Sequence, residues 1–87
     1  MPMVAAVGIE ISDVPRYQQL AAILREQIQA GELSPHKPIP SKIVLKQTYN
    51  VSGSTVDRAV NLLRDEGRLV TVPGLGLYVT ERKHWHS

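Results

Sequence analysis

The chain has 87 residues, which suffices for one domain but not for two, so a deep catalytic cleft between lobes is excluded. Cysteine is absent, and this excludes disulfides, thiolate metal sites and thiol catalysis. The 10 basic and 8 acidic residues leave a net charge of +2, which permits a polyanionic partner without requiring one. Hydrophobic residues make up 43% of the chain but Phe is missing, so we expect a small domain with an aliphatic core.

The first 14 residues are expected to form a loosely held arm, with a short strand over residues 8–11. The arm lacks the basic start of a signal peptide, and no segment reaches the roughly 20 apolar residues of a membrane-spanning helix. We therefore expect a cytoplasmic protein without a membrane partner. Pro15 suits the first turn of a helix, and Asp13 is a nearby candidate for its N-cap.

Apolar residues then recur at spacings of three and four, which predicts an amphipathic helix over residues 16–30 that Gly31 ends. This apolar stripe consists of Tyr17, Leu20, Ala21, Leu24 and Ile28. The following segment, residues 32–40, contains Pro35, Pro38 and Pro40. Because proline disfavours helix at and before its own position, this segment is predicted to be an extended loop.

Two serines mark the starts of two further helices. Ser41 is expected to cap a short helix over residues 42–49, and Ser52 a third helix from residue 53 to about 66. Asn50 suits the left-handed position of the tight turn between them. The expected buried positions are Leu45, either Val44 or Val51, and the stripe Val56, Ala59, Val60 and Leu63.

Two β-branched runs, residues 68–72 and 77–80, flank the Pro73-Gly74-Leu75-Gly76 turn and predict a hairpin. The polar segment 81–87 is expected to be a frayed tail. The fold class is therefore mainly α with a small β-hairpin, a three-helix winged helix-turn-helix over residues 15–80. In such a fold the third helix enters the major groove of DNA, and the hairpin, or wing, contacts the backbone or the minor groove.

This arrangement predicts a sequence-specific regulator of transcription that binds double-stranded DNA. Small polar residues at the start of the third helix would allow close approach, and basic side chains would meet phosphates. The candidate DNA-binding residues are Lys42, Lys46, Ser52, Gly53, Ser54, Thr55, Arg58, Asn61, Arg68, Gly74, Leu75 and Gly76.

Several short segments occur in order with family-like spacing: Pro15-Arg-Tyr-Gln-Gln-Leu-Ala, Ile28-Gln-Ala-Gly-Glu-Leu33, Ile39-Pro-Ser41, Val51-Ser-Gly-Ser-Thr-Val56, Ala59-Val-Asn-Leu-Leu63, Glu66-Gly67 and Gly74-Leu-Gly-Leu-Tyr-Val79. In these segments the chain resembles the DNA-binding domain of GntR-type bacterial regulators. The resemblance implies control of transcription, usually by dimers on palindromic operators. We accordingly expect a repressor that could form a homodimer. Family members generally carry a larger C-terminal effector domain, and none is evident in this chain.

The chain departs from the family at several DNA-facing positions. Gly53 and Ile43 stand where the family has arginine, Asp57 lies in a usually basic region, and Leu75 occupies a usually polar wing tip. Arginine is the strongest reader of guanine, so these changes leave an alternative open. In that alternative the winged helix is a protein–protein interaction module with weakened DNA binding.

No arrangement of residues points to catalysis, so we expect no enzyme activity and no cofactor. The three histidines, His36, His84 and His86, are not spaced from serine or aspartate in a way that suggests a triad. His84 and His86 supply two ligands at most, which is inadequate for a metal site.

Overall fold

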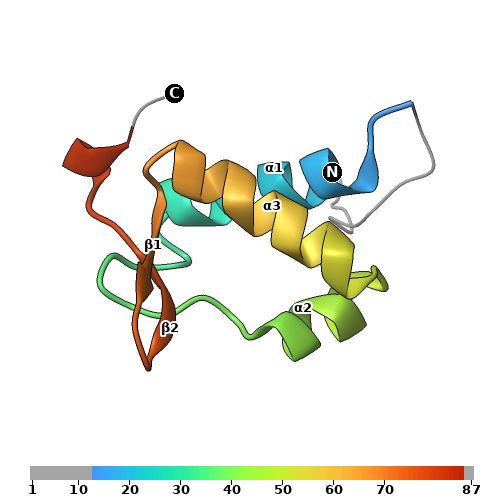
Figure 1. Cartoon of the computed structure of the whole chain (residues 1–87). Coiled ribbons are helices and arrows are strands. Elements are labelled where there is room, and N and C mark those ends of the chain that lie inside the picture. Colours follow the sequence, from blue (N-terminus) through green and yellow to red (C-terminus); the bar gives the residue numbers. More distant parts are fainter. Residues whose placement is uncertain (1–12, 86–87) are drawn as a thin grey trace.

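The computed structural model describes residues 13–85, which form three helices, a hairpin and a short 3₁₀ turn (Figure 1). The strand expected over residues 8–11 and the candidate ligand His86 lie outside the described residues. In chain order the elements are α1 (Arg16–Gln29), α2 (Lys42–Tyr49), α3 (Gly53–Asp65), β1 (Leu69–Val72), β2 (Gly76–Val79) and η1 (Arg82–His84). The predicted order of helix, short helix, helix and hairpin is confirmed.

An aliphatic core forms mainly where α1 and α3 pack together, and Figure 1 shows α1 lying behind α3. The predicted stripe of α3 is buried, as is that of α1 except for Tyr17, which is only partly buried against the core. The short helix α2 contributes Leu45. Val51, in the turn after α2, is buried while Val44 is exposed, so the turn rather than the helix supplies the extra core residue. The core comprises Leu20, Ala21, Leu24, Ile28, Leu45, Val51, Val56, Ala59, Val60, Leu63, Leu69 and Val79.

The helix boundaries follow from local capping. Ser41 Oγ accepts from the Val44 amide and Ser52 Oγ from the Thr55 amide, as the sequence predicts. The expectation that Asp13 caps α1 is wrong. Pro15 is itself the extended residue before the first turn, and α1 begins without a side-chain cap.

The proline-rich loop is more ordered than its sequence predicts. The amides of His36 and Ile39 donate to the carbonyls of Val79 and Leu77 at 2.8 and 3.1 Å, and the Val79 amide donates to the Lys37 carbonyl at 2.9 Å. The segment therefore lies along β2 and adds a partial third strand to the hairpin. Proline has no backbone N–H to donate, but the residues between the prolines keep theirs and supply the bonds.

The tail is also folded, at least as far as residue 85. Trp85 Nε1 donates to Thr80 Oγ1 at 3.1 Å, and two guanidinium groups lie against its indole ring. Arg68 and Arg82 approach the ring centroid at 4.9 and 4.6 Å. The expectation of a frayed tail is therefore wrong for residues 81–85, because one large aromatic ring in contact with two cations anchors them.

A polar cluster joins α1 to the end of α3 and the start of the hairpin. Arg25 makes a bidentate pair with Glu66 at 2.8 and 2.7 Å, and Arg68 Nε donates to the same carboxylate at 2.8 Å. The hydrogen bond from Arg25 is the main reason that the pKa of Glu66 lies below its ordinary value. The same pair raises the pKa of Arg25.

Glu66→Gln is expected to lower the free energy of unfolding at pH 7 by about 2 kcal/mol, because it removes charge-assisted bonds to two arginines. A depressed pKa stabilises the fold above the ordinary glutamate value of 4.5, and this contribution is lost as the pH falls through the lowered value. Urea unfolding across the acid range should therefore show a shallower loss of stability in the variant. Asp65→Asn, at an exposed neighbouring carboxylate, is the control and should keep the wild-type slope.

Trp85→Ala is expected to destabilise the domain by about 2 kcal/mol, because it removes two cation–π contacts and a packed ring. Thermal unfolding followed by circular dichroism measures this loss. His84→Ala changes an exposed neighbour and should leave the melting temperature unchanged. Equal melting temperatures for both variants would mean that the tail is not anchored by its tryptophan.

Candidate nucleic-acid interface

The tight turn between α2 and α3 fixes the angle of the helix-turn-helix. Asn50 adopts a left-handed conformation with φ 54°, and its amide donates back to the Lys46 carbonyl. Val51 then enters the core beside Leu45, so both helices are held by buried side chains. The polar faces of α2 and α3 consequently remain on the surface.

Three hydroxyl groups gather at the start of α3. Ser52 Oγ lies 3.1 Å from Ser54 Oγ and 3.0 Å from Thr55 Oγ1, in addition to its bond from the Thr55 amide. Ser52 is thus occupied by capping, and Thr55 is half-buried. Ser52 and Ser54 are both exposed, and Ser54 lies within the first turn of α3.

The exposed face of α3 continues from Ser54 through Asp57, Arg58, Asn61 and Arg64. The guanidinium of Arg58 lies 4.4 Å from the centroid of the Tyr17 ring on α1, which restrains it beside the helix. The sequence assigns Tyr17 to the apolar stripe of α1. The additional role of its ring face as a platform for Arg58 arises only from the packing of α1 on α3.

Lys42, the first residue of α2, reaches across to α3. Its Nζ lies 3.0 Å from Asp57 Oδ2. The side chain passes over Gly53, where an added Cβ would lie only 2.9 Å from Lys42 Cε and 3.9 Å from Lys46 Cδ. Gly53 therefore makes room for a lysine from α2, rather than leaving the start of α3 bare as its sequence suggests.

The wing ends in a tight turn beside the start of α2. The Leu75 amide donates to the Val72 carbonyl at 2.9 Å, and Gly74 has φ 80°, which glycine adopts without strain. Leu75 at the tip is 68% exposed. A hollow of about 290 Å³ separates the tip from α2, and Lys42 and Leu75 are among its lining residues. The wing tip and the start of α2 thus line the same hollow.

One predicted contact does not belong to this surface. Arg68 is only 6% exposed, pairs with Glu66 and stacks on Trp85. Its guanidinium is an internal link between α3, the hairpin and the tail, and it does not face a possible phosphate. An arginine beside a wing has the residue type of a phosphate contact whether or not it is buried, so its sequence position alone predicts such a contact.

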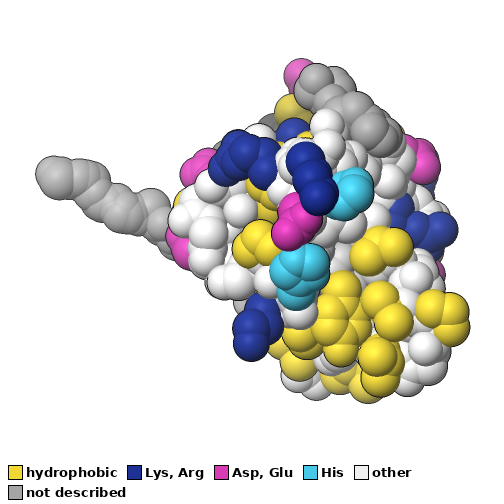
Figure 2. Space-filling model, turned by 90° about the vertical axis from the view of Figure 1, so that its left-hand side faces the viewer, with side chains coloured by type: hydrophobic (Ala, Val, Ile, Leu, Met, Phe, Trp, Pro, Cys, Tyr) yellow, Lys and Arg dark blue, Asp and Glu magenta, His cyan; other side chains and the backbone are white. Residues whose placement is uncertain are grey.

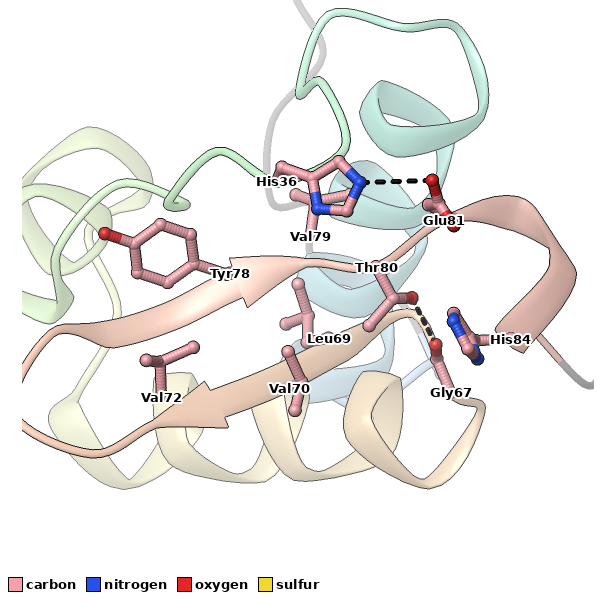
Figure 3. A pocket seen from close by; sticks show the side chains of 10 residues that line it. All are labelled: His36, Gly67, Leu69, Val70, Val72, Tyr78, Val79, Thr80, Glu81 and His84. Atoms are coloured by element: carbon pink, nitrogen blue, oxygen red, sulfur yellow. Dashed lines mark hydrogen bonds and ion pairs between the residues drawn. The ribbon is translucent and has the colours of Figure 1, made fainter.

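The outer face of the hairpin is apolar, and Figure 2 shows hydrophobic side chains gathered on the lower part of this side of the molecule. A hollow of about 510 Å³ lies here, with Val70, Val72 and Tyr78 on the strands and His36, Glu81 and His84 among its other lining residues (Figure 3). His36 pairs with Glu81 at 3.1 Å.

Across residues 13–85, no group of three or more histidine, cysteine, aspartate or glutamate side chains is arranged to hold a metal ion.

None of the described helices is long and apolar enough to cross a membrane.

Two curated relatives are similar to this chain over most of its length. It is 38% identical over 69 residues to a histidine utilization repressor of Klebsiella aerogenes, and 36% identical over 72 residues to the HTH-type transcriptional repressor NagR of Bacillus subtilis. These alignments cover 79% and 83% of this chain but only 29% and 30% of the relatives. The chain thus spans less than a third of the length of these proteins.

Two solved structures are similar in fold and sequence. YtrA from Sulfolobus acidocaldarius, a GntR-family transcription factor, superposes with a TM-score of 0.79 at 34% identity, covering 90% of this chain and 83% of YtrA. The DNA-binding domain of AraR in complex with operator ORX1 gives a TM-score of 0.74 at 31% identity, covering 77% and 81% of the two chains.

The family match agrees with both comparisons. Residues 16–79 match the family of bacterial regulatory proteins called the gntR family. This region runs from the start of α1 to the end of the hairpin, so it includes every element of the winged helix. On this ground the chain belongs to the GntR family of bacterial regulatory proteins and has the winged helix-turn-helix fold of its DNA-binding domains.

Proposed function

We propose that this chain binds double-stranded DNA as the reading domain of a transcriptional repressor, with α3 in the major groove and the wing beside it. The observation that carries the proposal is the exposed polar face of α3, next to a start of α2 that lines one hollow with the wing tip. The positive end of the α3 dipole opens onto this surface and favours phosphate. The AraR domain, similar in fold, was solved in complex with an operator, and the two curated relatives are repressors.

Individual residues receive roles from their positions. Lys46 and Arg58 are exposed cations suited to phosphates on either side of the groove. Ser54 and Asn61 lie on the outward face of α3, where their side chains can meet base edges. Leu75, between Gly74 and Gly76, would lie against sugar or backbone at the minor groove.

The surface has few free cations, which implies a modest affinity that depends on how well its shape fits the groove. Lys42 is paired with Asp57, and Arg68 is buried. We propose that two copies bind together, because a second half-site would raise the affinity that one such surface supplies. We place this activity in the cytoplasm, where a bacterial regulator meets its DNA.

The protein-interaction alternative is less favoured, although the apolar outer face of the hairpin is the feature that it would use. That face and the α3 surface are built from different residues. Substitutions can therefore test the two functions separately.

Lys46→Ala and Arg58→Ala are each expected to weaken binding to duplex DNA, because each removes a cation that would neutralise a phosphate. The log–log slope of affinity against salt should become shallower by about 0.9 for each phosphate that is no longer neutralised. Fluorescence anisotropy with a labelled duplex at several salt concentrations measures both effects. Lys83→Ala, which removes a cation from η1 at the other end of the hairpin, is the matched control. Unchanged affinity in both test variants would refute the proposed interface.

Leu75→Ser is expected to reduce duplex affinity severalfold without changing the melting temperature, because this side chain is already exposed in the folded protein. Val70→Ser changes an exposed residue on the outer face of the hairpin and should leave DNA binding intact. The opposite pattern, in which only Val70→Ser has an effect and that effect is loss of self-association in sedimentation, would favour the interaction module.

A further inference from the structure

The ion pair between Lys42 and Asp57 lies at the centre of the proposed DNA surface. Nζ and Oδ2 are 3.0 Å apart, and the two side chains are 52% and 58% exposed. An exposed pair of this kind contributes little to stability, since water screens the charges and two flexible side chains must be ordered. The pair therefore calls for an explanation other than holding α2 against α3.

The side chain of Lys42 lies close above Gly53. A Cβ at Gly53 would lie 2.9 Å from Lys42 Cε and 3.5 Å from Nζ, so the lysine stem crosses the first turn of α3 at close range. This path brings the ammonium onto the outward face of α3 beside Asp57. The lysine supplies a cation where α3 has no basic side chain of its own in its first turn.

The paired groups present hydrogen-bond donors beside an acceptor. The ammonium has three donors and uses one on Asp57, while the carboxylate keeps free lone pairs. In the major groove a guanine–cytosine pair shows the matching pattern: two acceptors, O6 and N7, beside the N4 amino donor. A thymine–adenine pair in the same orientation also places an acceptor beside a donor, but it offers a methyl group in place of the second acceptor.

We propose that Lys42 and Asp57 together read one guanine–cytosine pair, an inference that rests on the proposed DNA-binding function. Lys42 donates to guanine O6 and N7, and Asp57 accepts from cytosine N4. Because the two charges cancel, the pair adds discrimination between base pairs without adding to non-specific attraction. Asp57 also disfavours a nearby phosphate, which directs the pair towards bases rather than the backbone.

The test begins with selection of duplexes from a random pool by the 87-residue chain at fixed salt. Competition binding then compares the selected duplex with versions changed at one base pair. The wild-type protein should show one position at which guanine–cytosine is preferred, thymine–adenine is weaker, and both reversed pairs are weakest. Replacing that guanine by 7-deazaguanine removes N7 and should also weaken binding.

Lys42→Met keeps the aliphatic stem over Gly53 but removes the donors, and Asp57→Ala removes the acceptor. Each should reduce the preference at this single position by about tenfold or more and leave the other positions unchanged. Asp57→Ala should in addition raise affinity for unselected duplex, since it removes a negative charge facing DNA. If the pair only stabilised the fold, Asp57→Ala would not lower the preference for one base pair while raising affinity for unselected duplex.

Lys83→Met, which breaks the exposed pair of Lys83 with Glu81 at 3.3 Å, is the matched control and should change no preference.

Three results would overturn the inference, and they are distinguishable. Unchanged preferences in both single variants would show that the pair reads no base. A uniform loss on all duplexes with Lys42→Met would make Lys42 a phosphate contact. Failure of the wild-type chain to bind any duplex would refute the proposed function as well.

Discussion

The packing of α1 against α3 is the contact on which the rest of the structure depends. Leu20 and Leu24 from α1 and Leu63 and Val56 from α3 are almost fully buried, in a chain that has no phenylalanine to fill its core. Burial of this stripe forces the opposite, polar face of α3 outward. The surface proposed to read DNA is thus a direct consequence of which face of α3 the core occupies.

A cluster of charged side chains determines where the wing lies. Glu66 binds Arg25 of α1 and Arg68 at the start of the hairpin, so the direction in which the chain leaves α3 is fixed by charge-assisted bonds. Trp85 then covers Arg68 from the other side. These contacts and the partial strand of residues 36–39 hold the hairpin at the end of α3. A winged helix needs this rigidity, because its two reading elements must fit neighbouring parts of one duplex.

The restraint of several cations by other protein groups explains how this mildly basic domain is proposed to bind a polyanion. Arg68 is committed to the interior, Arg58 is restrained on Tyr17, and Lys42 is paired with Asp57. Few cations remain free for the backbone, so the proposed affinity depends on how well the surface matches the groove. Specificity then comes from fixed donors and acceptors rather than from a general attraction to phosphate.

The sequence by itself determined the element order, the two serine caps, the left-handed Asn50 turn and the buried stripes, because each is encoded within a few neighbouring residues. It also indicated the family, through short segments in a fixed order. Only the tertiary structure decided that Arg68 is internal, that Lys42 crosses Gly53 to Asp57, and that Trp85 and the proline-rich loop pack on the hairpin. These contacts join residues distant in the chain, and residue type alone does not distinguish a buried arginine from one that meets a phosphate.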